Sequence, residues 1–119
     1  MTGVNLTKVC LDVRIPGSGM NVAAVRCAAG RVPEVIGKPA KPIFEYIKEK
    51  FCVDHARTVV VGDRCDTDIK FGKDNNMTTL LIGTGVNSLE NMLQFEKEGR
   101  MDLVADYYSP SLLDLVQSL

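Results

Sequence analysis

Two short apolar runs, with a helix-forming segment between them, constrain the fold of this chain most strongly. TVVV at residues 58–61 and TTLLI at residues 78–82 are rich in β-branched and aliphatic side chains. This composition is typical of strands that are buried on both faces of a parallel sheet. The segment between them predicts a helix that begins at Asp66 or Thr67 and ends near residues 72–75. The order strand, helix, strand indicates an α/β fold in which 58–61 is a central parallel strand.

The rest of the chain continues this alternation. Apolar segments predict further strands at residues 7–13 and 105–107, with a brief extended piece at 33–36. Glycine and proline punctuation, together with helical spacing, predicts helices over residues 20–29, 42–51, 87–98 and after Pro110. In the helix from Asn87, Glu90 stands three residues later, which predicts a capping box. The spacing in the helix from residue 42 predicts one apolar face made of Ile43, Phe44, Ile47 and Phe51.

Composition narrows the possible partners. A chain of 119 residues with 45% hydrophobic residues has the length of one globular domain. Its net charge of -1 and the absence of a basic cluster in the sequence argue against nucleic acid and against an anionic membrane surface. No run approaches the roughly 18 apolar residues that a membrane-spanning helix needs. We therefore expect neither nucleic acid nor a membrane among the partners.

The cysteines indicate a reducing environment. They form no C-x-x-C pair, which argues against a zinc knuckle and a thioredoxin-type redox site. The N-terminal residues lack the apolar core of a signal peptide. We expect a cytoplasmic protein with reduced, mostly buried thiols at Cys10, Cys27, Cys52 and Cys65.

Three carboxylates crowd the segment VVVGDRCDTDIKFG, residues 59–72. Asp63 follows Gly62 at the carboxyl end of a predicted parallel strand, which is where open α/β sheets place their ligands. A carboxylate there can bind Mg²⁺, which uses one or two carboxylates together with water and phosphate oxygens. Asp66 and Asp68 lie at the start of the next helix, where a carboxylate can cap free N–H groups. We interpret Asp66 as a solvated cap, and Asp68 as either a cap or a support for the Asp63 site.

Lys38 is the second candidate for chemistry. It lies in a Gly-Lys-Pro sequence, and a residue before proline favours an extended loop conformation. Alone, Lys38 is most simply a surface charge. Beside Asp63 it can supply a fixed positive charge for a phosphate or for a neighbouring carboxylate.

Three segments together resemble a known family. IGKPAKPIFEYI, then VVVGDRCDTDIKFG, then TTLLIGTGV look like the carboxyl-terminal half of haloacid dehalogenase superfamily phosphatases. The branch they resemble contains 4-nitrophenylphosphatase, phosphoglycolate phosphatase and pyridoxal phosphate phosphatase. The upstream segment at residues 15–39 resembles the end of that branch's cap domain and its return to the core. The resemblance implies a cap-like tail over residues 1–36 and half of a Rossmann-like core, with a partial parallel sheet, over residues 37–119.

The resemblance also implies roles for the candidate residues. Lys38 matches the lysine that steadies the nucleophile and the phosphoryl group, and Asp63 matches the aspartate that binds Mg²⁺. Asp68 matches the second acidic position, which supports the site. The implied activity is Mg²⁺-dependent hydrolysis of a small phosphate monoester of the phosphoglycolate or 4-nitrophenyl phosphate type, through an aspartyl-phosphate.

The sequence departs from this family in two respects, one of which is that the family's Ser/Thr motif does not occur in its proper place before the cap. The sequence also contains no D-x-D-G-T motif, which carries the family's nucleophile, and Asp12 in VCLDVRIPG is followed two residues later by Arg14 instead of a second aspartate. We therefore expect a fragment that is inactive alone. The alternatives are an inactive pseudophosphatase that serves as a binding or oligomerisation module, and a receiver-like module phosphorylated on Asp63. Because the 58–61 strand would lack its usual neighbour, we expect a homo-oligomer or association with the missing half of the fold.

Overall fold

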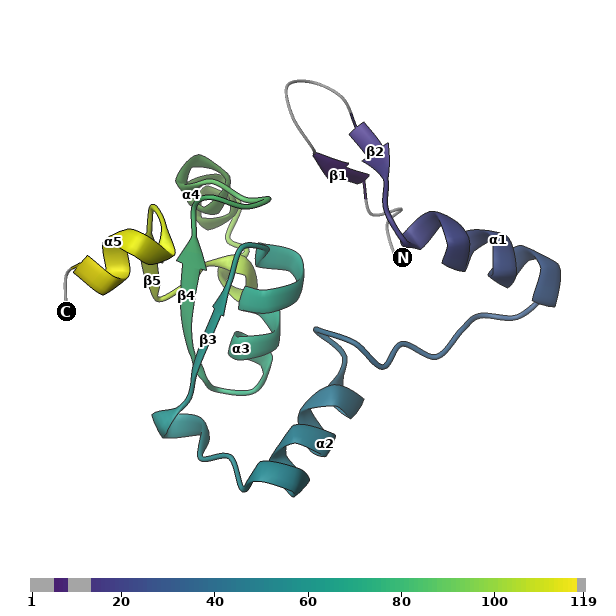
Figure 1. Cartoon of the computed structure of the whole chain (residues 1–119), viewed down its shortest axis with the longest axis horizontal. Helices are drawn as coiled ribbons and strands as arrows, with labels where there is room; N and C mark the ends of the chain where they lie inside the picture. The colour runs from purple at the N-terminus through teal and green to yellow at the C-terminus, as the bar shows by residue number, and fades with distance from the viewer. Residues whose placement is uncertain (1–5, 9–13, 118–119) are drawn as a thin grey trace. The chain divides into compact units, whose positions relative to one another are not determined.

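The structure, a computed structural model, describes residues 6–8 and 14–117. The chain divides into two compact units, Met1–Val35 and Ile36–Leu119 (Figure 1). The domains predicted from the family resemblance, 1–36 and 37–119, have a boundary close to this division. Their assignment as cap tail and half core stays a prediction.

The first unit contains two short strands and a helix. β1 (Leu6–Lys8) and β2 (Arg14–Pro16) pair in antiparallel orientation. Residues 9–13 of the strand predicted over 7–13 lie outside the described residues.

The helix predicted over residues 20–29 is confirmed as α1 (Gly19–Ala29). Gly30 ends it with a φ of 63°, a left-handed conformation that glycine adopts without strain. None of the α1 residues is buried.

The second unit is built on a three-stranded parallel sheet. Its strands are β3 (Val59–Gly62), β4 (Thr78–Ile82) and β5 (Tyr107–Ser109), in the order β3-β4-β5. β4 coincides with the predicted TTLLI strand, and its four residues from Thr79 onward are buried. The α/β fold with a parallel sheet is therefore confirmed.

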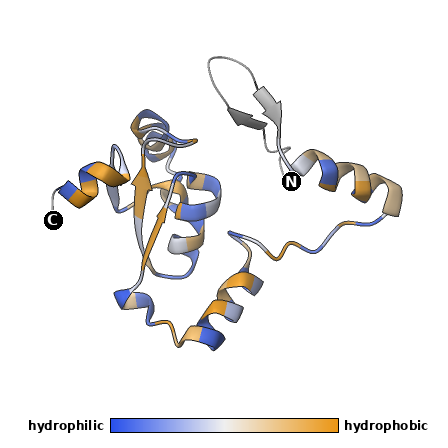
Figure 2. Cartoon of the chain, in the orientation of Figure 1, coloured by the Kyte–Doolittle hydropathy of each residue, from blue (hydrophilic) through white to orange (hydrophobic). Residues whose placement is uncertain are grey.

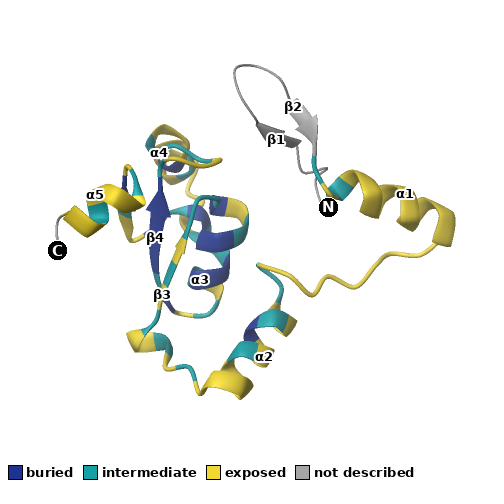
Figure 3. Cartoon of the chain, in the orientation of Figure 1, coloured by how far each residue is buried: buried dark blue, intermediate teal, exposed yellow. Residues whose placement is uncertain are grey.

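The prediction of a central, doubly buried strand at 58–61 is wrong for the part of the chain that the structure describes. β3 is an edge strand there, and Val59 and Val61 are 54% and 47% exposed. The strand is strongly hydrophobic in Figure 2, yet it is much less buried than β4 in Figure 3. Exposed and half-buried residues alternate along the strand.

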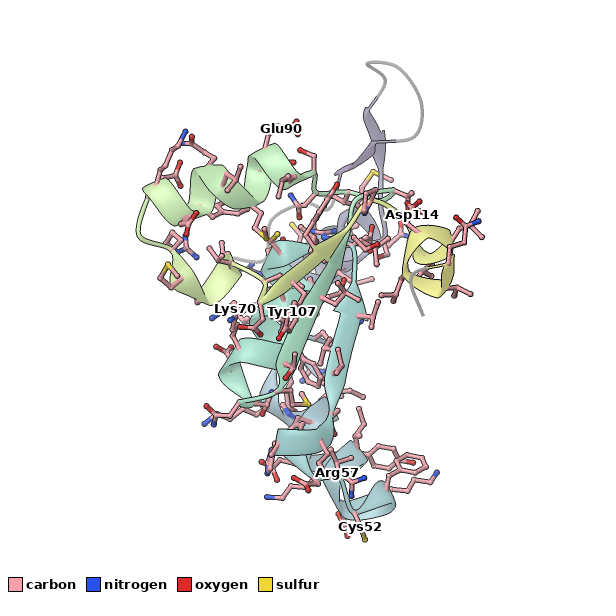
Figure 4. All side chains as sticks on the ribbon, turned by 90° about the vertical axis from the view of Figure 1, so that its left-hand side faces the viewer. Cys52, Arg57, Lys70, Glu90, Tyr107 and Asp114 are labelled. Carbon is pink, nitrogen blue, oxygen red and sulfur yellow. The ribbon has the colours of Figure 1, made fainter. Side chains whose placement is uncertain are left out.

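Helices flank the sheet on both faces. Figure 4 shows Glu90 of α4 and Asp114 of α5 on opposite sides of the strands. The helical elements of this unit are α2 (Lys41–Phe51), a 3₁₀ turn (His55–Arg57), a π-helical turn (Cys65–Ile69), α3 (Lys70–Asp74), α4 (Leu89–Lys97), a second 3₁₀ turn (Met101–Leu103) and α5 (Leu112–Gln117). None of the helices among residues 6–8 and 14–117 is long and apolar enough to cross a membrane.

Two apolar clusters hold the second unit together. Phe44 of α2 packs with Phe71 and Met77. The ring centroids of Phe44 and Phe71 are 6.0 Å apart. Burial of each such side chain contributes about 1.5–3 kcal/mol. The larger cluster joins the π-helical turn, β4 and α4 through Cys65, Ile69, Leu81, Met92, Leu103 and Ala105.

Three local predictions need correction. Phe51, expected on the buried face of its helix, is 64% exposed, because it is the last residue of α2. The capping box of α4 uses Ser88 and Asn91 instead of Asn87 and Glu90, since Ser88 has the extended backbone of a cap and its hydroxyl accepts from Asn91 N–H. The expectation of mostly buried thiols is also wrong for the described residues, where Cys65 is buried but Cys27 and Cys52 are exposed, and all three are unpaired.

Asp102 is paired with two basic side chains. Asp102 accepts from Arg100 at 3.1 Å and from Lys70 at 3.3 Å. The hydrogen bond from Arg100, with a further contribution from Lys70, holds the pKa of Asp102 below its usual range. Asp102 is therefore stabilised in its charged form by folding.

Candidate functional site

The candidate site is built where β3 ends. Gly62 closes the strand and Asp63 follows it. A Cβ atom at Gly62 would overlap the side chain of Asp68, and one at Gly85 would overlap the carboxylate of Asp63. The two glycines therefore allow two aspartate side chains to lie against the backbone at the carboxyl edge of the sheet.

Asp63 is held by the loop between β4 and α4. Its Oδ2 atom accepts a hydrogen bond from Val86 N–H at 2.9 Å, and its backbone carbonyl accepts one from Asn87 N–H at 2.9 Å. Among the described residues, the other carboxylate oxygen, Oδ1, accepts no hydrogen bond and makes no ion pair. One oxygen is thus fixed by the backbone and the other is available to a cation.

Lys38 and Asp68 are brought together from residues thirty positions apart. Lys38 Nζ lies 2.5 Å from Asp68 Oδ1, and Asp68 Oδ2 accepts from Arg64 N–H at 3.2 Å. The Asp68 side chain is 9% exposed, whereas that of Lys38 is 49% exposed. Of the two targets considered for Lys38, the structure shows a neighbouring carboxylate. About half of the Lys38 side chain remains accessible to solvent.

Lys38 lies in a tight loop, and the Lys38–Pro39 peptide bond is cis. Residues 37–40 form a turn, closed by a hydrogen bond from Ala40 N–H to the Gly37 carbonyl. The turn directly precedes α2. Lys38 is therefore anchored on its C-terminal side by a helix that packs into the core through Phe44.

Asp66 takes a different role from the helix cap that was expected. It accepts from Arg64 Nε at 2.9 Å and from the terminal nitrogen Nη2 at 2.7 Å, and its side chain is 58% exposed. The hydrogen bond to Asp66 raises the pKa of Arg64. The π-helical turn that starts at Cys65 has no side-chain cap. Asp66 therefore forms a solvated ion pair at the rim of the site.

Asn87 is a residue of the site that sequence reasoning missed. Its Oδ1 atom accepts from Cys65 N–H at 2.8 Å, so its side chain joins the β4–α4 loop to the turn after Asp63. The spacing between Asn87 and Glu90 predicts a helix cap at Asn87. The competing signal was present in the sequence, since Ser88 with Asn91 fits the same pattern one residue later.

Cys65 is unsuited to act as a nucleophile. Its side chain is fully buried, and burial, with a smaller effect from Asp66 and Asp68, raises the pKa of the thiol to about 11. The thiol is therefore protonated at neutral pH, whereas the thiolate is the reactive form.

Mg²⁺ fits this set of donors as a partly protein-bound ion. The described residues contain no cluster of three His, Cys, Asp or Glu side chains that could hold a metal. Mg²⁺ needs fewer, because it is commonly bound by one or two carboxylates with water and phosphate oxygens completing the octahedron. Asp63 Oδ1, which accepts no hydrogen bond within residues 6–8 and 14–117, could serve as such a ligand.

Comparison with known proteins places the chain in a family. The family model described as HAD-hydrolase-like matches residues 35–111. The chain is 49% identical over 106 residues to chronophin from Mus musculus and 44% identical over 108 residues to glycerol-3-phosphate phosphatase from Gallus gallus. These alignments cover 89% and 88% of this chain but 36% and 35% of the two relatives, so the chain spans about a third of their length.

Solved structures agree with this placement. A p-nitrophenyl phosphatase from Archaeoglobus fulgidus superposes with a TM-score of 0.70 at 36% identity, covering 98% of this chain and 44% of that one. A glycerol phosphate phosphatase from Mycobacterium tuberculosis, in complex with magnesium, superposes with a TM-score of 0.71 at 33% identity, covering 95% of this chain and 32% of that one. The sequence match and the parallel sheet with its acidic carboxyl edge therefore show that the chain belongs to the HAD-hydrolase-like family.

Proposed function

We propose that residues 36–119 supply the Mg²⁺-binding and charge-neutralising groups of a phosphate monoester hydrolase. The observation that carries the proposal is the state of Asp63. Its Oδ2 is fixed by Val86 N–H, while its Oδ1 has no partner in the part of the chain that the structure describes. The Lys38–Asp68 pair is linked to the same turn through Arg64 N–H. One turn of the backbone would therefore supply both the cation ligand, Asp63, and the carboxylate that holds the Lys38 ammonium group, Asp68.

The chemistry of phosphoryl transfer suits these groups. Catalysis of this reaction depends on positioning and on neutralising the charge of the phosphoryl oxygens. Bound Mg²⁺ supplies much of that neutralisation. Asp63 would hold it, Lys38 would contact the phosphoryl group with its exposed side, and Asp68 would fix the position of Lys38.

The named relatives support the substrate class. Glycerol-3-phosphate phosphatase and p-nitrophenyl phosphatase are named for phosphate monoesters, so a small phosphorylated metabolite is the proposed substrate. The sequence contains no D-x-D-G-T motif, and the proposal therefore assigns binding groups to this chain and leaves the attacking group to another segment. The cytoplasmic location expected from the cysteines remains part of the proposal.

A chimera provides the test. This chain would replace the matching third of mouse chronophin, and hydrolysis of p-nitrophenyl phosphate with Mg²⁺ would be measured. We expect an active chimera whose kcat/KM falls about 10²–10³-fold in Lys38→Ala and in Asp63→Ala, the loss typical of removing one charge-stabilising group. Asp66→Ala is the matched control, because Asp66 is a carboxylate on the same turn and should change activity little. A folded chimera in which Asp63→Ala retains full activity would contradict the proposal.

The open edge of β3 favours a second candidate function. Val59 and Val61 are exposed on this strand, and unpaired edges tend to recruit another strand. The chain would then be a catalytically inactive module that forms homo-oligomers or associates with a segment that completes the sheet. Sedimentation separates the candidates: a compact monomer at high concentration would exclude the homo-oligomer. Activity in the chimera would exclude an inactive site.

A further inference from the structure

Asn87 lies in the loop between β4 and α4 and belongs to neither element. β4 ends at Ile82 and α4 begins at Leu89, with Ser88 as its cap. The side chain of Asn87 takes no part in that capping box, which is formed by Ser88 and Asn91. Asn87 is thus available for a contact elsewhere.

Asn87 makes this contact with the backbone of Asp63, the candidate metal ligand, and of Cys65. Asn87 N–H donates to the carbonyl of Asp63 at 2.9 Å, and Asn87 Oδ1 accepts from Cys65 N–H at 2.8 Å. One residue therefore binds the backbone on both sides of Arg64. Val86 N–H donates to Asp63 Oδ2 at 2.9 Å, so the loop and the turn are joined by three hydrogen bonds.

The burial of Cys65 makes the side-chain bond costly to lose. Cys65 is fully buried, and its N–H lies at the start of the π-helical turn, before the N–H groups that bond back to Arg64. A buried N–H needs an acceptor. The Asn87 amide oxygen supplies it from across the loop.

We propose that Asn87 is a positioning residue for Asp63. Asn87 fixes the β4–α4 loop against the turn after Asp63 and so keeps the hydrogen bond from Val86 N–H to Asp63 Oδ2. Asp63 Oδ1 is then left to bind a divalent cation. This inference rests on the proposed role of Asp63. It predicts that loss of the Asn87 side chain weakens cation binding even though Asn87 itself is not a ligand.

The first test measures the geometry without a metal. Hydrogen exchange of the Val86 amide is compared in the wild-type chain, Asn87→Ala and Ser88→Ala. We expect protection of Val86 to fall about tenfold in Asn87→Ala, the factor that corresponds to about 1.4 kcal/mol. Ser88→Ala is the matched control, because it lies next in the chain and removes a helix cap while leaving all three bonds of the loop to the turn. Unchanged Val86 protection in Asn87→Ala would overturn the positioning role, whatever the metal does.

The second test measures the cation. Mn²⁺ affinity, from the paramagnetic broadening of backbone amides, should fall about tenfold in Asn87→Ala and remain unchanged in Ser88→Ala. Asn87→Asp keeps a side-chain acceptor for Cys65 N–H and should restore the protection of Val86. Equal Mn²⁺ affinity in folded Asn87→Ala and wild type would overturn the inference. Mn²⁺ binding that is insensitive to Asp63→Asn would instead refute the proposed function, and that result is separate from the hydrogen-exchange result.

Discussion

The Lys38–Asp68 pair gives the sharpest prediction for stability. Lys38→Met removes the ammonium while keeping a chain of similar length, and Asp68→Asn removes the negative charge while keeping an oxygen that can accept from Arg64 N–H. The two changes and their combination form a double-mutant cycle. The cycle isolates the interaction between the two charges from the packing of each side chain.

Burial sets the size of the effect. Removing one partner from a buried ion pair costs about 3–5 kcal/mol, whereas exposed pairs contribute about 0–1 kcal/mol. The Asp68 side chain is 9% exposed but that of Lys38 is 49% exposed, so water can partly replace the ammonium. Arg64 N–H also remains as a partner in the Lys38 variant. We therefore expect a coupling of about 1–2 kcal/mol, between the buried and the exposed limits.

Urea unfolding followed by far-ultraviolet circular dichroism measures the four free energies. Lys38→Met should be the most destabilised of the set, because it leaves Asp68 charged and largely buried. The double variant should recover part of that loss, since it leaves no buried charge. Additive effects, within about 0.3 kcal/mol, would refute the reasoning that the two charges are coupled in the folded chain.

Three further predictions concern the surroundings of the site. Gly62→Ala should destabilise the fold by about 1–3 kcal/mol in urea unfolding, because its Cβ would overlap Asp68, whereas Gly37→Ala, whose Cβ meets open space, should cost much less. Folding lowers the pKa of Asp102, so its contribution to stability is present above the unfolded pKa of 3.8 and is lost as the pH falls through the folded pKa. In Asp102→Asn the free energy of unfolding should therefore fall less steeply with decreasing pH. The same pH dependence in this variant and in the wild-type chain would contradict the prediction. In thiol labelling mapped by mass spectrometry, Cys27 and Cys52 should be modified early, and Cys65 should stay unmodified until the chain unfolds. Early labelling of Cys65 would contradict its burial and its raised pKa.

The sequence predicts elements well where a local pattern decides the structure. TTLLI forms β4 with the predicted limits because its β-branched and aliphatic side chains fit the pleated, buried surface of a central strand. Gly30 ends α1 as predicted because glycine adopts the left-handed conformation without strain. The same type of pattern at residues 58–61 predicts a strand correctly, but the prediction that this strand is buried on both faces is wrong. The position of a strand within its sheet depends on which other strands are present.

Long-range contacts explain what could not be predicted at the site. The sequence offers both Asn87 and Ser88 as the start of a capping box. In the structure Ser88 caps α4, and Asn87 accepts a hydrogen bond from Cys65 N–H, which lies 22 residues earlier. Asp68 was expected as a cap or as support for the site, and the structure joins it to Lys38 across 30 residues. The roles of Lys38, Asp63 and Asp68 in catalysis stay predictions.

The most direct test of the central claim is where a divalent cation binds. Titration of Mn²⁺ into the isotope-labelled chain, followed by amide broadening, reports the position of the ion. The proposed site predicts the strongest broadening at residues 62–64 and 85–87, competition by Mg²⁺, loss in Asp63→Asn and retention in Asp66→Asn. Broadening centred on the exposed Asp66, or unchanged in Asp63→Asn, would contradict the assignment of Asp63 as the metal ligand.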